Sequence, residues 1–167
     1  MKTLIQNYSS GQISIENLPY PKIREDEILI KTSFSAVSLG TEASMINLAK
    51  KNIFGKALER PDLVKRVLDK AKQTSFSEAI QMSLNKLDTP VPLGYSASGR
   101  VIEVGKKIKN FKEGDFVSAI GSGFASHSEY IVVPEMMLAH AKENILKESA
   151  FGMLGCISMH ACRLSNI

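Results

Sequence analysis

The stretch that decides the fold reads LGYSASGRVIEVG over residues 93–105 and, after a short gap, FKEGDFV over residues 111–117. Residues 99–105 are rich in β-branched side chains and have a glycine at each end, which is typical of a strand between two turns. Residues 112–115, KEGD, have the composition of a turn, and the apolar run after them predicts a second strand over residues 116–120. These short strands and glycine turns favour a β architecture.

Further strands are predicted on both sides of this stretch. Their patterns are QISIE at residues 12–16, EILIKTSFSAV at 27–37, SHSEYIVV at 126–133 and the shorter MLAH at 137–140. Each run combines β-prone residues with alternation or with a bounding proline or glycine. The chain is therefore predicted to be mainly β, as a small β-barrel or a strongly bent sheet.

The pattern changes to helices between residues 41 and 88. Three helices are predicted there: one over 41–50 with Thr41 as a possible N-cap, one opened by Pro61, and one opened by the capping box of Ser75 and Glu78. We interpret residues 41–88 as a helical insertion on the rim of the β structure. A last helix is predicted from residue 143 or 147 to residue 164.

The composition is that of one soluble globular domain. The chain has 167 residues, of which 44% are apolar and 23% charged. The longest apolar stretch, residues 150–159, is too short to span a bilayer. Residues 1–12 lack the apolar region of a secretory signal, so we expect a cytoplasmic protein. The two cysteines, Cys156 and Cys162, fit no usual zinc or redox spacing and are expected to be free thiols.

The positive charge is concentrated in one segment. The chain has a net charge of +4, and residues 50–72 contain eight basic and three acidic side chains. Such a segment is able to contact nucleic acid or phosphate, but a solvated, charge-rich helix face is the simpler interpretation.

One glycine motif imitates a dinucleotide-binding fingerprint. Residues 121–126 read GSGFAS, which is one residue short of that pattern. The fingerprint requires a helix after its last glycine, because the helix N-terminus faces the pyrophosphate. Here a β-prone run follows, so the motif predicts a turn between strands.

Several motifs occur together in a known order. Residues 93–105 and 111–117 resemble the medium-chain, alcohol dehydrogenase-like reductases, in which G-H-E-x-x-G-x-V-x-x-V-G leads into F-K-x-G-D-x-V. Residues 39–42, LGTE, look like the family's C-G-[ST]-D, and residues 129–134, EYIVVP, look like its A-E-Y-x-x-V-P. The resemblance implies that residues 1–167 form the family's GroES-like β-barrel, its substrate-side catalytic domain, with peripheral helices and the helical insertion at about 41–88.

The resemblance places the zinc ligands of the family at residues unsuited to zinc. The Cys ligand falls at Leu39, the His ligand at Tyr95 and the third ligand near Gly152. Leu and Gly do not bind zinc, and a neutral Tyr is a poor ligand. The family's four-cysteine structural zinc loop is also missing, since residues 43–90 contain no cysteine. We therefore expect a domain without zinc.

Hydroxyl groups take the place of the metal in the expected site. Thr41 falls where zinc-dependent members have a proton-relaying Ser or Thr, so it is the first candidate for contact with a substrate oxygen. Tyr95 and Ser96 replace the metal-side residues, and a phenol is able to polarise a carbonyl by hydrogen bonding. A purely structural Tyr95 is an equal alternative. Glu42 is expected to be a structural carboxylate, and His127 a surface or turn histidine.

The resemblance implies an NAD(P)-dependent oxidoreductase that acts on a small-molecule alcohol or carbonyl substrate. The sequence has no glycine-rich βαβ pattern, so NAD or NADP would bind to a nucleotide-binding Rossmann domain of the same polypeptide that is absent from this chain. We expect the isolated chain to be inactive and without bound cofactor. Residues 55–57 and 60–64 further resemble a bacterial subgroup fused to a sugar-dehydrogenase-like oxidoreductase.

A second hypothesis remains open. The chain would then be a non-catalytic GroES-like binding module with the basic segment 50–72 as its partner surface. Under the preferred hypothesis we expect no nucleic-acid or membrane partner. An uncovered apolar face on the last helix leaves room for a homo-oligomer.

Overall fold

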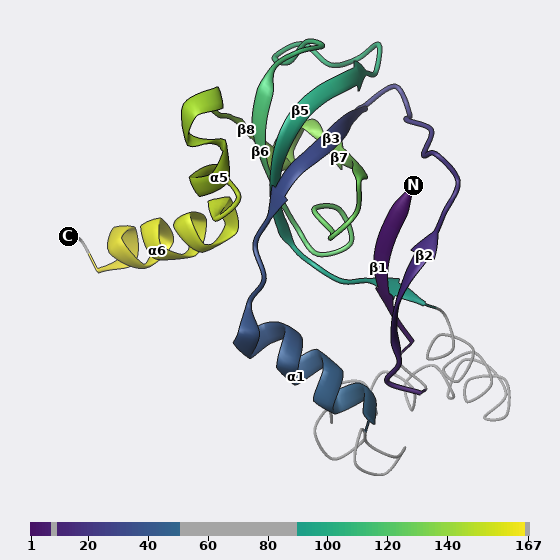
Figure 1. Cartoon of the computed structure of the whole chain (residues 1–167). Helices are drawn as coiled ribbons and strands as arrows, with labels where there is room; N and C mark the ends of the chain where they lie inside the picture. Colours follow the sequence, from purple (N-terminus) through teal and green to yellow (C-terminus); the bar gives the residue numbers. More distant parts are fainter. Residues whose placement is uncertain (8–9, 51–89, 166–167) are drawn as a thin grey trace, which may run out of the picture. The chain divides into compact units, whose positions relative to one another are not determined.

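The computed structural model describes residues 1–7, 10–50 and 90–165 (Figure 1). The helices predicted after Pro61 and Ser75, and the basic segment apart from Lys50, lie outside these residues. The strands are β1 (Lys2–Gln6), β2 (Ile13–Asn17), β3 (Glu27–Ser35), β4 (Val91–Pro92), β5 (Ser96–Val104), β6 (Phe116–Ile120), β7 (Tyr130–Pro134) and β8 (Leu138–His140). The helices are α1 (Leu39–Lys50), α5 (Leu146–Ser149) and α6 (Gly152–Leu164), with 3₁₀ turns η1 (Glu135–Met137) and η2 (Glu143–Ile145).

The strands form two sheets, so the predicted mainly β fold is confirmed. One sheet has the order β2-β1-β4 and the other the order β7-β3-β5-β6-β8. In the five-stranded sheet all neighbouring strands are antiparallel. The chain divides into two compact units. The first contains Met1–Leu4, Ile15–Val37 and Pro92–Ile167, and the second contains Ile5–Ser14 and Ser38–Val91.

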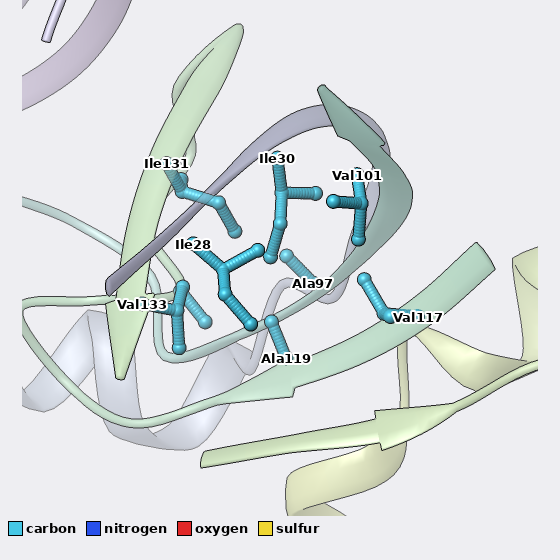
Figure 2. Packing of buried hydrophobic residues seen from close by; sticks show 9 residues of the cluster. Ile28, Ile30, Ala97, Val101, Val117, Ala119, Ile131 and Val133 are labelled. Carbon is cyan, nitrogen blue, oxygen red and sulfur yellow. The ribbon is translucent and has the colours of Figure 1, made fainter. Parts of the chain in front are cut away.

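The core of the first unit lies on the five-stranded sheet. Strand β3 pairs with β5 on one side and β7 on the other, and its Ile28, Leu29 and Ile30 are completely buried. Figure 2 shows the cluster formed by inward-facing side chains of four strands: Ile28, Ile30, Ala97, Val101, Val117, Ala119, Ile131 and Val133. Burying such aliphatic side chains contributes about 1.5–3 kcal/mol each for the larger ones, and this holds the sheet together.

Gly99 allows β5 to approach β3 closely. A Cβ at this position would collide with the backbone carbonyl of Lys31 on the neighbouring strand. The register between β3 and β5 also shifts twice, between Leu29 and Ile30 and between Thr32 and Phe34. Such bulges increase the local bend of a sheet, as expected for a strongly bent β structure.

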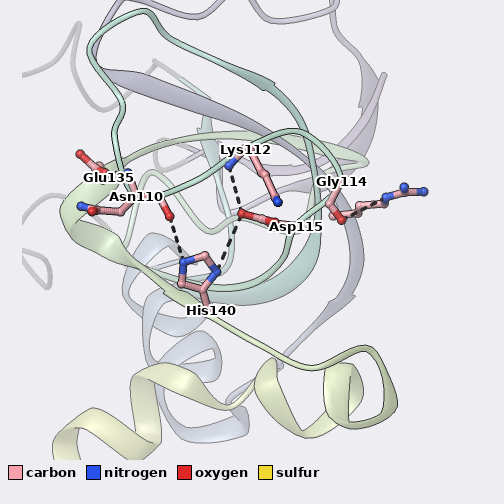
Figure 3. Close-up of polar contacts among 7 residues, drawn as sticks. Asn110, Lys112, Gly114, Asp115, Glu135 and His140 are labelled. Atoms are coloured by element: carbon pink, nitrogen blue, oxygen red, sulfur yellow. Dashed lines mark hydrogen bonds and ion pairs between the residues drawn. The ribbon is translucent and has the colours of Figure 1, made fainter.

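The loop between β5 and β6 is fixed by side chains of the following segment (Figure 3). The predicted turn over residues 112–115 is present, and Asp115 Oδ2 accepts the Lys112 N–H at 3.0 Å. Glu135 Oε1 accepts the Asn110 N–H at 2.9 Å, and His140 Nε2 lies 2.9 Å from the Asn110 carbonyl oxygen. His140 therefore has a structural position on β8.

Several predicted boundaries were wrong. The strand predicted over residues 99–105 is β5, which already begins at Ser96 and ends at Val104. The strand expected from residue 126 begins at Tyr130, because residues 127–129 bond to several different neighbours instead of one strand. The helix expected from Thr41 begins at Leu39, because Ser38 caps it. The single last helix is divided into η2, α5 and α6. The motif at residues 121–126 is a turn as predicted, with φ of 112° at Gly121 and 84° at Gly123.

The second unit contributes α1 and a turn to the described residues. In the turn, the Asn7 N–H donates to the Gln12 carbonyl at 2.9 Å, and Gly11 has a φ of 73° that suits glycine. No helix in the described part of the chain has both the length and the apolar character needed to cross a bilayer.

Candidate functional site

Thr41 lies in the exposed first turn of α1. Ser38 Oγ accepts the Thr41 N–H at 3.3 Å and donates its own proton to Thr41 Oγ1 at 3.2 Å. This is the capping geometry that satisfies a free N–H at a helix start. The Thr41 hydroxyl keeps its own proton in this arrangement, so it is able to donate to an oxygen of another molecule.

Glu42 completes the start of the same helix. Its carboxylate is buried, and Oε1 accepts the Ser38 N–H at 3.3 Å. A carboxylate in the first turn of a helix is also favoured by the helix dipole. Through this contact Glu42 stabilises the start of the helix.

Tyr95 lies between β4 and β5 in the first unit. Its backbone carbonyl accepts the Gly121 N–H at 2.8 Å, which ties it to the glycine turn after β6. The side chain is half-buried, and its hydroxyl makes no hydrogen bond to any residue within the described ranges. A phenol with this freedom has both a donor and an acceptor function to offer to a ligand.

Ser96 is completely buried, and both functions of its hydroxyl are engaged. Ser96 Oγ donates to the Ala150 carbonyl at 2.6 Å and accepts the Met153 N–H at 3.1 Å. Met153 is in the first turn of α6, where an N–H has no partner inside the helix. Ser96 thus joins β5 to the end of α5 and the start of α6.

Two further serines act in the same way. Ser98 Oγ donates to the Leu146 carbonyl at 2.5 Å, and Ser118 Oγ donates to the Ser149 carbonyl at 2.6 Å. Ser98 and Ser118 are paired across β5 and β6. We call Ser96, Ser98 and Ser118 the serine anchor, because together they fix α5 and the start of α6 to the sheet.

Sequence reasoning missed this function of the serines. It treated Ser96 as lining the site and did not single out Ser98 or Ser118. The available signal was the pattern S-A-S inside an apolar strand, because a buried hydroxyl requires a hydrogen-bond partner. The partners are 31 to 54 residues away in the sequence, so their identity was not visible from the pattern.

The three positions matched to zinc ligands do not form a donor set. Leu39 has an apolar side chain that is 83% exposed. Gly152 has no side chain, and a Cβ at its position would meet Ser118 Oγ. Within the described ranges, no three His, Cys, Asp or Glu side chains are grouped closely enough to hold a metal ion. The three matched positions and the other described side chains therefore do not fit a catalytic zinc.

The predicted site residues belong to different units. Tyr95 and Ser96 are neighbours in the first unit, whereas Thr41 belongs to the second. Tyr95 and Ser96 differ in their hydrogen bonds. The Tyr95 hydroxyl has no hydrogen-bond partner in the described part of the chain, whereas the Ser96 hydroxyl has two.

Comparison with known proteins gives consistent similarities. Residues 69–143 match the alcohol dehydrogenase GroES-like domain. The chain is 26% identical over 119 residues to L-threonine 3-dehydrogenase of Bacillus velezensis, which covers 71% of this chain and 25% of that protein. It is 30% identical over 147 residues to the chloroplastic NADPH-dependent alkenal/one oxidoreductase of Arabidopsis thaliana, which covers 82% and 29%.

Among solved structures, galactitol-1-phosphate dehydrogenase of Escherichia coli matches with a TM-score of 0.60 and 16% sequence identity. The match covers 90% of this chain and 41% of that one. The fold is therefore GroES-like, as predicted. The chain spans 25% and 29% of the lengths of the two curated relatives.

Proposed function

Since the chain belongs to the medium-chain, alcohol dehydrogenase-like dehydrogenase/reductase family, we propose that it is the substrate-side domain of an NAD(P)-dependent oxidoreductase. The substrate is an alcohol or carbonyl compound. Support comes from the two curated relatives, one a dehydrogenase and the other an NADPH-dependent oxidoreductase. Because the chain spans less than a third of either relative, the proposal concerns one part of a larger enzyme.

The cofactor is assigned to a second domain of the same polypeptide. A dinucleotide site of the Rossmann type needs parallel strands joined by a helix. In the described part of the five-stranded sheet every pairing is antiparallel, so these strands do not provide that unit. When bound in the second domain, the nicotinamide supplies or accepts the hydride.

The surface of α6 supports a covering partner domain. Phe151, Leu154, Ile157 and Leu164 recur at helical spacing, and all four side chains are exposed. A continuous exposed apolar stripe of this kind marks an interaction surface. We assign it to the nucleotide-binding domain, and without that domain the stripe would promote self-association of the isolated chain.

The proposed reaction uses no zinc, and one observation carries this part of the proposal. The position matched to the histidine ligand holds Tyr95, whose hydroxyl has no hydrogen-bond partner in the described part of the chain. The phenol donates a hydrogen bond to the substrate carbonyl and stabilises the negative charge that develops there during reduction. A single well-placed donor contributes about 10²–10³ in rate.

The other two hydroxyls have different functions in this proposal. Thr41, whose hydroxyl is exposed, is the residue that the family resemblance assigns to contact with the substrate. The Ser96 hydroxyl already donates to the Ala150 carbonyl and accepts the Met153 N–H, so Ser96 acts as a positioning residue that holds the start of α6.

The proposal is tested by Tyr95→Phe in the complete enzyme. We expect kcat to fall by at least about tenfold, since one transition-state donor is removed while the ring is kept. Tyr20→Phe is the matched control, because it removes the hydroxyl of a tyrosine whose ring packs on Tyr130. The two ring centroids lie 4.8 Å apart. An unchanged kcat in Tyr95→Phe would reduce Tyr95 to a packing residue and remove the proposed mechanism.

A further inference from the structure

The backbone around Tyr95 is held at both ends by neighbouring segments. We call residues 93–96 the Tyr95 turn. At its start, the Leu93 carbonyl accepts the His127 N–H at 2.7 Å. At its end, the Ser96 carbonyl accepts the Ala36 N–H at 2.9 Å. The two segments that hold the turn are therefore the chain at His127 and the end of β3.

These two segments are joined to each other by a side-chain hydrogen bond. His127 Nδ1 lies 2.8 Å from the hydroxyl oxygen of Ser35, the residue before Ala36. The three hydrogen bonds form a closed loop of contacts. It runs along the Tyr95 turn to Ala36 and Ser35, and returns through the His127 side chain to Leu93. Both side chains in the bond are half-buried, which protects it from competition with water.

Gly94 brings the imidazole against the turn itself. Gly94 has a φ of 101°, and a Cβ built there would lie 2.8 Å from the His127 backbone nitrogen and 3.1 Å from ring atoms Cγ and Nδ1. Only glycine combines this φ with such a close approach. The His127 ring thus packs on the backbone that immediately precedes Tyr95.

From this geometry we propose that His127, bonded to Ser35, is a positioning residue that fixes the Tyr95 turn. The Tyr95 hydroxyl has no hydrogen bond within the described residues, so the phenol takes its place from its backbone and from packing. The effect of this positioning on catalysis rests on the proposed function, in which the Tyr95 hydroxyl donates a hydrogen bond to the substrate carbonyl. A misplacement of about 1 Å is enough to lower a rate by about 10².

The variants separate the hydrogen bond from simple packing. His127→Phe keeps a ring of similar shape but loses both ring nitrogens, Nδ1 among them. His127→Asn loses the ring but places an amide group near the position of Nδ1, so it restores the bond to Ser35. Ser35→Ala removes the hydroxyl that bonds to the imidazole. If His127→Phe does not fold, Ser35→Ala still tests the same hydrogen bond.

Positioning is measured first in this chain by amide hydrogen exchange, which needs no activity. The reporters are the Gly121 N–H, bonded to the Tyr95 carbonyl, and the Ala36 N–H, bonded to the Ser96 carbonyl. Loss of one hydrogen bond predicts roughly five- to tenfold faster exchange at both amides in His127→Phe and in Ser35→Ala. Exchange in His127→Asn should stay within about twofold of the original chain.

The same variants in the complete enzyme test the consequence for the reaction. We expect His127→Phe and Ser35→Ala to lower kcat roughly fivefold and to leave the KM for the nicotinamide within about twofold, with recovery in His127→Asn. Combining His127→Phe with Ser35→Ala should add little, because both remove the same bond.

The two proposals fail in different ways. Unchanged exchange in His127→Phe and Ser35→Ala overturns the positioning inference, as does equal acceleration in His127→Asn and His127→Phe. If exchange behaves as expected while Tyr95→Phe leaves kcat unchanged, positioning stands and the proposed function fails.

Discussion

Replacing Ser96 by alanine is the perturbation whose outcome the structure defines most closely. The change removes one oxygen atom from a fully buried site and leaves two backbone groups without their partner. These groups are the Ala150 carbonyl, whose residue is 2% exposed, and the Met153 N–H at the start of α6. Little packing is lost, so the effect is almost entirely that of the two broken hydrogen bonds.

The magnitude follows from the burial of these groups. An orphaned buried donor or acceptor costs about 1–3 kcal/mol. The buried Ala150 carbonyl belongs in the upper part of this range, at about 2–3 kcal/mol, and the N–H of the half-buried Met153 adds about 1 kcal/mol. We therefore expect a loss of about 3–4 kcal/mol in the free energy of unfolding. For a chain of this size, this lowers Tm by roughly 6–16 °C.

Urea unfolding followed by far-ultraviolet circular dichroism is the suitable assay, because the chain contains no tryptophan to report by fluorescence. Ser149→Ala is the matched control, since within the described residues its hydroxyl donates to the exposed Ile145 carbonyl. The control should change stability by less than about 0.5 kcal/mol. If Ser96→Ala matched this control, the serine anchor would not hold α6 to the sheet.

Further predictions concern glycines and one phenol. Gly99→Ala should destabilise the chain by about 3 kcal/mol or prevent folding, because its Cβ collides with the Lys31 carbonyl; a stable variant in urea unfolding would contradict the packing of β3 on β5. Gly155→Ala in α6, with nothing within 4 Å of its Cβ, should instead stabilise by about 0.5–1 kcal/mol in the same assay. Partial desolvation, with Tyr130 and Glu103 nearby, raises the pKa of Tyr20 above 10.0. Its contribution to stability is thus present below pH 10.0 and lost as the pH rises through the higher folded pKa. The difference between the spectrophotometric titrations of the original chain and of Tyr20→Phe should have its midpoint above pH 10.0, and a midpoint at or below that pH would refute this.

The strands were predictable where local pattern and tertiary environment agree. Residues 116–120 form β6 as predicted, because the turn before them is set by local chemistry and the run itself alternates between buried and half-buried positions. The strand predicted over residues 27–37 is β3, which ends two residues earlier at Ser35. The division of the last helix was not predictable, since it depends on serines from distant strands.

The candidate site residues were chosen from the sequence, but their hydrogen-bond partners were not predictable from it. The sequence identified Thr41, Tyr95 and Ser96 as hydroxyls, and resemblance gave them a common place. Which hydroxyl has a partner depends on contacts far along the chain, such as that between Ser96 and Ala150. His127 was expected at a surface or turn, and its half-buried bond to Ser35 joins residues that are 92 positions apart.

In the proposed mechanism, hydroxyl groups that donate hydrogen bonds replace a catalytic metal. The decisive measurement is the turnover of the complete enzyme, together with its metal content, before and after dialysis against a strong zinc chelator. We expect substoichiometric zinc and an unchanged kcat after dialysis. One tightly held zinc per chain, with activity lost on its removal and recovered on its return, would contradict this mechanism.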